Sequence, residues 1–217
     1  MQRILNSTLV ADGRSDKVLL PLIHRLMEAY CPGPFRDTDF VEDYPDVGYG
    51  LAQRVRYALA QHPCDILFVH RDAEQRDSVD RREAEIKAAV ASLPAPRLFI
   101  AIIPVRMTEA WLLADEQAIR HAAGNPTGRA SLNLPATNQI EAVDAKERLF
   151  EALSLAKNLN NRRTSRLRPE ALRHRVADHL DDLTSLRRLP SGPIHPRPSP
   201  RRSARRADSL HECRRPA

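Results

Sequence analysis

The sequence has no long apolar run, few cysteines and none of several common catalytic motifs. No stretch approaches the roughly 18 apolar residues of a membrane span, and the first residues carry no apolar leader. The three cysteines, Cys31, Cys64 and Cys213, lack the paired spacing of a disulfide framework or a zinc site. There is no Gly-rich phosphate loop, no pair of metal-binding histidines and no Ser–His–Asp spacing. We therefore expect a soluble, cytoplasmic protein that has no membrane partner and binds no metal through thiolates.

The net positive charge of the 217-residue chain is concentrated at its end. The formal net charge is +6 and the isoelectric point is near 9.6. Residues 191–217 contain seven arginines against Asp208 and Glu212, so this segment holds five of the six net charges. Because the rest of the chain is nearly neutral, net charge is a weak argument for nucleic-acid binding by the folded part.

Strand-like and helix-like segments alternate through the first 123 residues. The runs at residues 65–70 and 97–105 are almost continuously apolar, as in strands that are covered on both faces of a parallel sheet. Between the strands, apolar residues recur every three or four positions, which predicts amphipathic helices. The predicted strands are residues 4–11, 38–42, 65–70 and 97–105, and the predicted helices are residues 15–30, 51–62, 80–93 and 106–123. This alternation predicts an α/β fold with a Rossmann-like parallel sheet of about four strands flanked by helices.

Two segments of different character follow this predicted α/β domain at residues 1–123. Helical spacing returns at residues 140–155 and again from Pro169 onward, so residues 124–190 are predicted to form a C-terminal helical extension. From residue 191 onward, prolines interleave with arginines and serines and no apolar face remains. Residues 191–217 are therefore predicted to be a disordered Pro/Arg-rich tail.

Acidic residues follow two of the predicted strands. Asp12 follows the first strand, and Asp72 and Glu74 follow the third. Parallel α/β sheets bind ligands at the carboxyl ends of their strands, so we expect these acids to meet at one sheet edge. Arg106 and Glu109 lie in the first turn of a helix that starts at the same edge. Asp12, Asp72, Glu74 and Glu109 are therefore the candidate catalytic residues.

Structural explanations exist for several residues near this edge. The acids after residues 65–70 can simply open a polar loop, and Glu109 can complement the dipole of its helix. For Asp16 we favour a helix cap over a role in the site, and for Trp111 we favour core packing. Gly13 allows a tight turn between the first strand and its helix.

The folded part contains one cluster of basic residues, at positions 157–175. It comprises Lys157, Arg162, Arg163, Arg166, Arg168, Arg173 and Arg175. Such runs are most often solvated surface, but this cluster can follow a phosphate backbone if it borders the acidic edge. In that interpretation Arg162, Arg163 and Arg166, together with Arg106, are the candidate nucleic-acid-binding residues.

Three segments resemble a known family in their order and spacing. They are Ala-Asp-Gly-Arg-Ser-Asp-Lys at residues 11–17, Phe-Val-His-Arg-Asp-Ala-Glu at 68–74 and Arg-Met-Thr-Glu-Ala-Trp-Leu-Leu-Ala-Asp at 106–115. Over about residues 1–190 the chain resembles a Toprim-like family of small bacterial proteins marked by the Glu-Ala-Trp-Leu-Leu-Ala-Asp segment. Toprim domains occur in topoisomerases, primases and overcoming-lysogenization-defect nucleases.

The resemblance implies a Toprim-like fold and a site that holds Mg²⁺, or Mn²⁺, for phosphoryl transfer. In Toprim domains an acid after the first strand and an acidic pair after the third hold the metal, which implies Asp12 in the first role and Asp72 with Glu74 in the second. The usual first acid is Glu, and the shorter Asp12 favours metal binding over general acid–base catalysis. A second register would pair His70 with Asp72. We prefer Asp72 with Glu74, because Mg²⁺ takes oxygen ligands.

Two classes of function follow. In the first, the chain is a Mg²⁺-dependent phosphoryl-transfer enzyme or nuclease acting on DNA or RNA, in defence against phage or mobile DNA as the resemblance suggests, with a partner protein encoded nearby. In the second, it is a catalytically degenerate Toprim-like module that binds or regulates a partner. A receiver-like domain with Asp72 as phosphoacceptor is disfavoured by the helical layer and the Glu109 segment. The tail is either a frame-shifted ending or a native polybasic arm that adds non-specific affinity for nucleic acid.

Overall fold

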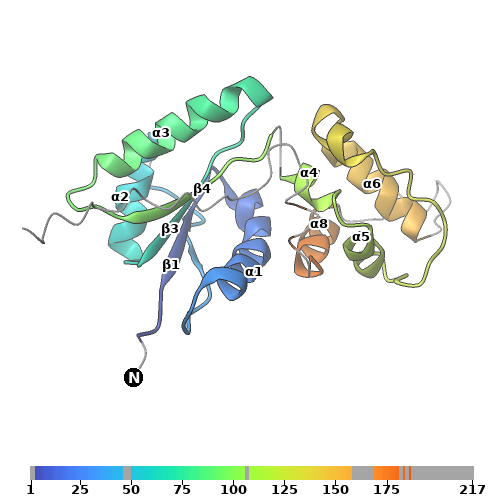
Figure 1. Ribbon diagram of the computed structural model, residues 1–217, viewed down its shortest axis with the longest axis horizontal. Helices are drawn as coiled ribbons and strands as arrows, with labels where there is room; N and C mark the ends of the chain where they lie inside the picture. The colour runs from blue at the N-terminus through green and yellow to red at the C-terminus, as the bar shows by residue number, and fades with distance from the viewer. Residues whose placement is uncertain are drawn as a thin grey trace, which may run out of the picture.

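The computed structural model describes residues 3–45, 50–105, 108–157 and 169–180, together with Leu183 and Leu186. Within them, a parallel four-stranded sheet carries helices on both faces, and further helices pack beside it (Figure 1). The predicted α/β class, with a parallel sheet flanked by helices, is confirmed. None of the helices in these ranges is both long and apolar enough to cross a membrane. The predicted tail at residues 191–217 lies outside the described residues.

The sheet has the strand order β2-β1-β3-β4. Its strands are β1 (Ser7–Val10), β2 (Asp39–Phe40), β3 (Ile66–His70) and β4 (Leu98–Ile102). All neighbours are parallel, with Val10 opposite Val69 and His70 opposite Ile102. The carboxyl ends of β1 and β3 therefore lie side by side in the middle of the sheet.

The strands are shorter than the runs that predicted them. The apolar run at residues 97–105 pairs as a regular strand only up to Ile102. Pro104 follows, and it has no N–H group to donate to a ladder. Beyond it, an isolated bridge joins Ala73 to Val105 and keeps the segments after β3 and β4 together.

Successive side chains of each strand point to opposite faces of the sheet and so belong to two different hydrophobic cores. Leu9 and Phe68 belong to the core on the side of α1 (Leu20–Tyr30). Val10, Leu67 and Val69 belong to the core formed with α2 (Leu51–Gln61) and α3 (Val79–Ala91). Figure 1 shows α1 on one side of the sheet and α2 and α3 on the other. Because both faces of β3 are covered, all its residues are buried, which explains its unbroken apolar run.

The segment after β1 begins as a 3-10 helix, Arg14–Leu19, and α1 starts only at Leu20. The sequence predicted one continuous helix from residue 15. Pro21 explains the difference, because it lacks an N–H group and its ring clashes with the carbonyl group four residues earlier in a regular α-helix. In the first turn of α1 the missing donor is tolerated.

The helices after β4 pack on the α1 side and share its core. They are α4 (Glu109–Leu112), α5 (Glu116–Ala122), α6 (Ala145–Ala156) and α8 (Pro169–Asp178), with a 3-10 helix at Thr137–Ala142. The predicted helix at residues 106–123 is broken, because Asp115 caps α5 by accepting a hydrogen bond from the N–H of Ala118 at 3.0 Å. Trp111 is 1 % exposed and packs in this shared core, which confirms its predicted role.

Candidate functional site

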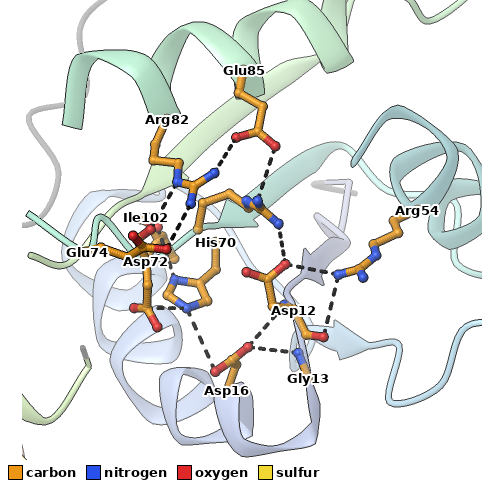
Figure 2. A network of polar contacts seen from close by, with 11 residues as sticks. Asp12, Gly13, Asp16, Arg54, His70, Asp72, Glu74, Arg82, Glu85 and Ile102 are labelled. Carbon is orange, nitrogen blue, oxygen red and sulfur yellow. Dashed lines mark hydrogen bonds and ion pairs between the residues drawn. The ribbon is translucent and has the colours of Figure 1, made fainter. Parts of the chain in front are cut away.

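Two of the predicted acids lie where the central strands of the sheet end. Asp12 follows β1 and Asp72 follows β3, and these strands are direct neighbours. Figure 2 shows the ring of His70 between Asp72 and Asp12, and Asp16 next to both His70 and Asp12. The parallel sheet therefore gathers residues that are far apart in the sequence into one polar cluster.

Asp12 is held by two arginines. Its Oδ1 accepts hydrogen bonds from Arg54 Nη1 at 2.9 Å and from Arg71 Nη1 at 2.5 Å. Arg54 comes from α2, and Arg71 also lies 3.3 Å from Glu85 of α3. The two guanidinium groups compensate the charges of Asp12 and Glu85, and an anionic group such as a phosphate can accept further hydrogen bonds from them.

Asp16 closes the turn between β1 and the 3-10 helix. Its Oδ2 accepts hydrogen bonds from the N–H groups of Asp12 at 3.1 Å and Gly13 at 3.0 Å, and its own N–H donates to the Gly13 carbonyl oxygen at 3.1 Å. The capping role favoured for Asp16 is therefore present. Gly13 itself is extended, with φ −162°, and a Cβ there would meet nothing within 4 Å, so the turn does not depend on glycine.

His70 ends β3 with its ring buried beside two of the acids. The Nδ1–H group donates to the carbonyl oxygen of Ile102, its partner in β4, at 3.1 Å. Nε2 lies 3.6 Å from Asp72 Oδ1 and 3.8 Å from Asp16 Oδ1. These separations exceed hydrogen-bond lengths, and Nε2 has no hydrogen-bond partner in the described part of the chain.

Asp72 is the most perturbed acid of the cluster. Its side chain is 41 % exposed overall, yet Oδ1 is buried and meets no hydrogen-bond donor among the described residues. The pKa of Asp72 is raised to about 6, mainly by burial; the negative charges of Asp16, Asp12 and Glu109 contribute to the rise, and His70 opposes it. An acid with a pKa near neutrality and an unpartnered oxygen is a candidate functional group.

Glu74 lies apart from the buried oxygen of Asp72. Its side chain is 76 % exposed, and its Oε1 is 3.8 Å from Arg82 Nη2. Arg82 reaches the same loop from α3 and donates from Nε to the carbonyl oxygen of Asp72 at 3.2 Å. The buried oxygen of Asp72 thus lies 3.6 Å from His70 Nε2, whereas the side chain of Glu74 is mostly exposed to solvent.

Glu109 is buried in an ion pair. Its Oε1 accepts a hydrogen bond from Arg173 Nη1 of α8 at 2.6 Å, and Arg173 Nη2 donates to the carbonyl oxygen of Ser15 at 2.9 Å. Glu109 is close enough to raise the pKa of Asp72, but its own charge already has a partner. The geometry assigns Glu109 a role in holding α8 to the turn that carries Asp16.

Several predicted residues cannot be placed. Arg106, Arg162, Arg163 and Arg166, the candidate nucleic-acid-binding residues, lie outside the described residues. Conversely, the sequence did not single out Arg54, which no local pattern distinguishes from other helix-surface arginines. His70 enters the sequence-based prediction only as the partner of Asp72 in the second register, and its position at the end of a buried strand, two residues before Asp72, is the signal that could have favoured it.

The cluster does not contain a complete protein cage for a metal. In the part of the chain that the structure describes, no three His, Cys, Asp or Glu side chains are grouped closely enough to hold an ion by themselves. Among the described residues of the cluster, Asp72 Oδ1 and His70 Nε2 are buried atoms that could bind a metal ion and have no hydrogen-bond partner. The arrangement can bind an anion through its arginines, and it can give a cation one buried carboxylate oxygen.

Comparisons with known proteins supply no relative for this arrangement: no family model matches the chain, and neither the curated proteins nor the solved structures give a match. Function is therefore argued from the site itself.

Proposed function

We propose that this protein is a Mg²⁺- or Mn²⁺-dependent phosphoryl-transfer enzyme of the Toprim type that cleaves nucleic acid at the edge formed by Asp12 and Asp72. The observation that carries the proposal is the buried, unpartnered Oδ1 of Asp72, an acid whose pKa is raised by burial and by the charges of Asp16, Asp12 and Glu109. Carboxylates placed in this way repel one another unless a cation neutralises them. A divalent ion at the carboxyl ends of β1 and β3 would remove that repulsion.

The donor chemistry of the edge suits such an ion. Mg²⁺ keeps several water ligands and is commonly bound through one or two carboxylates together with substrate phosphates, so a cage of three protein ligands is not required. Asp72 offers its free Oδ1, and both arginine contacts of Asp12 fall on Oδ1, which leaves the other carboxylate oxygen for a cation. Glu74 is the third predicted ligand. A bound ion supplies positive charge that stabilises the transferring phosphoryl group.

The arginines around Asp12 are proposed to hold the phosphate. Arg54 and Arg71 converge on one oxygen, and an arriving phosphodiester would accept hydrogen bonds from the same guanidinium groups. Asp16 holds the backbone N–H groups of Asp12 and Gly13 and so keeps the Asp12 side chain at the strand end. The nucleic-acid strand would then lie over the carboxyl edge of the sheet, with its phosphates beside the acids.

Cleavage assays with matched aspartate variants test the proposal. The purified chain is incubated with single-stranded DNA, duplex DNA or RNA in Mg²⁺, Mn²⁺ or EDTA. Asp72→Asn and Asp12→Asn should each lower cleavage by at least about tenfold, the scale of losing a metal-site contact. Asp77→Asn, on the exposed turn before α3, is the control and should leave cleavage unchanged. Cleavage that persists in EDTA or in Asp72→Asn would contradict the proposal.

A second candidate function is a degenerate module that binds nucleic acid or a partner without cutting. The observation that favours it is the neutralisation of Asp12 by Arg54 and Arg71, which competes with any metal for this carboxylate. Nucleic-acid binding that survives EDTA and Asp72→Asn, with no cleavage in either metal, would support this second function.

A further inference from the structure

His70 is a buried polar side chain that the proposed function does not yet use. Its side chain is 1 % exposed, and Nε2 is unpartnered within the described residues. A buried nitrogen without a hydrogen bond is unfavourable, and such atoms are normally paired in folded proteins. Because this nitrogen faces the acids of the proposed cation site, coordination of the ion is a role that would satisfy it.

The His70 ring is fixed in the orientation of a metal ligand. The Ile102 carbonyl oxygen can only accept a hydrogen bond, so Nδ1 carries a proton, and Nε2 is the ring nitrogen whose lone pair a metal ion can take in the neutral ring. Metal-binding histidines commonly donate their other ring N–H group to a backbone carbonyl in this way. Here the contact follows from the register of β3 and β4, in which His70 is opposite Ile102.

Two carboxylate oxygens face Nε2 across a gap. Asp72 Oδ1 is 3.6 Å away and Asp16 Oδ1 is 3.8 Å away. Nitrogen and oxygen ligands that are each about 2.1 Å from one ion lie roughly 3.0–3.4 Å apart. The two Nε2–Oδ1 distances are therefore slightly too long for a formed metal site among the described residues. A small movement of the two carboxylates toward Nε2 would bring all three atoms within bonding distance of one ion.

We propose that His70 Nε2, with Asp72 and Asp16, forms a mixed nitrogen–oxygen site that selects a first-row transition ion, such as Mn²⁺, over Mg²⁺. The inference rests on the proposed function, that this edge binds a divalent cation, and it assigns which ion. Imidazole nitrogen suits transition ions, whereas Mg²⁺ prefers sites made of carboxylate, carbonyl and water oxygens. Asp16 keeps Oδ2 in its turn, and its Oδ1, which also receives a 3.3 Å contact from Ser15 Oγ, is the oxygen that faces His70.

Metal binding measured on the full chain without substrate tests the assignment. Calorimetric titration with Mn²⁺ alone and with Mg²⁺ alone should give a dissociation constant at least about tenfold lower for Mn²⁺. Pulsed electron paramagnetic resonance of the Mn²⁺ complex should show coupling to a directly bound nitrogen. Binding of Mn²⁺ without nitrogen coupling would overturn this inference and leave the proposed metal enzyme intact. If neither ion binds, both proposals fail.

Two histidine variants separate coordination from structure. His70→Gln replaces the ring nitrogen with an amide group, so Mn²⁺ affinity should fall about 10–100-fold and the nitrogen coupling should disappear, while Mg²⁺ affinity is kept or raised. His24→Gln is the matched control, because its half-exposed ring lies beside the surface acids Glu28 and Asp37 and the ring of Phe35, and it should change neither affinity. A folded His70→Gln protein that keeps the Mn²⁺ preference would refute the assignment. If His70→Gln does not fold, the spectrum of the unaltered protein decides.

Discussion

Asp72 and Glu109 both have buried carboxylate oxygens near the same edge of the sheet. Only Glu109 forms a hydrogen-bonded ion pair with an arginine. Glu109 and Arg173 form an ion pair at 2.6 Å with side chains 5 % and 8 % exposed. Asp72 Oδ1 lies 3.6 Å from His70 Nε2, and it has no hydrogen-bond partner in the described part of the chain. Since a buried charge needs a partner, the paired acid belongs to the framework and the unpaired one is where a ligand is expected.

The paired acid also explains how the helical layer supports the site. Arg173 of α8 contacts Glu109 of α4 and donates to the carbonyl oxygen of Ser15. Ser15 precedes Asp16, whose carboxylate holds the turn after β1. One buried arginine thus fastens a helix beyond the sheet to the turn that positions Asp12 and Asp16.

Removing the charge of Glu109 from its ion pair with Arg173 should have the largest effect on stability. Glu109→Gln removes the negative charge that faces the buried guanidinium group of Arg173, so the free energy of unfolding should fall by about 3–5 kcal/mol. The double variant Glu109→Gln/Arg173→Met should recover part of the loss. Unfolding in urea measures both changes.

The Arg148–Glu151 pair on α6 is the matched control for that experiment. It has the same kind of contact, at 2.7 Å, but its side chains are 41 % and 51 % exposed. Glu151→Gln should therefore cost less than about 1 kcal/mol. If Glu109→Gln were equally mild, the contrast with Asp72 would disappear and Glu109 would return to the catalytic candidates.

A divalent cation that binds at Asp72 should stabilise the folded protein. At an ion concentration 100 times the dissociation constant, binding to the native state alone adds about 2.7 kcal/mol to the free energy of unfolding. Asp72→Asn should abolish this gain and slightly stabilise the metal-free protein by relieving repulsion, whereas Asp77→Asn should retain the gain. Thermal melts with Mn²⁺ and Mg²⁺ measure the effect, and a midpoint that neither ion moves would contradict the metal site.

The raised pKa of Asp72 should also make the stability of the metal-free protein depend on pH. Because the pKa of Asp72 is raised from 3.8 to about 6 by burial, the folded state binds the proton more tightly than the unfolded state. The free energy of unfolding should therefore fall as the pH rises from about 4 to about 6. Since the side chain is 41 % exposed, solvent screening limits the change to the order of 1 kcal/mol.

Asp72→Asn isolates this contribution from the rest of the protein. Glu42 and Asp43 have lowered pKa values because of Lys17 and Arg14 respectively, so they act in the opposite direction over a similar pH range. The difference in stability between the unaltered protein and Asp72→Asn cancels these common contributions. A difference that stays constant between pH 4 and pH 6 would show that Asp72 titrates normally.

The sequence predicted the fold because its apolar patterns are local. The run of β3 and the stripes of α1 and α2 each follow from a few consecutive residues. Strand ends and helix breaks were predicted less well, because they depend on single residues such as Pro21 and Asp115 acting on the backbone.

The candidate site was predictable only in part. Asp12 and Asp72 follow strands directly, so the parallel order of the strands was enough to bring them together. The partners of the acids could not be inferred, because Arg54 lies 42 residues from Asp12 and Arg173 lies 64 residues from Glu109. The buried face of His70 depends on its register with Ile102, which no local pattern encodes.

Glu74 should show the smallest effect on stability, and it decides between the two registers of the metal pair. Its side chain is 76 % exposed and 3.8 Å from Arg82, so Glu74→Gln should change the free energy of unfolding by less than about 0.5 kcal/mol. If His70 and Asp72 form the pair, Glu74→Gln should leave Mn²⁺ affinity nearly unchanged, whereas loss of a true ligand should lower it by about tenfold or more. The same calorimetric titration compares Glu74→Gln with His70→Gln. A larger loss in Glu74→Gln would make the ligand set all oxygen, and the expected preference would then return to Mg²⁺.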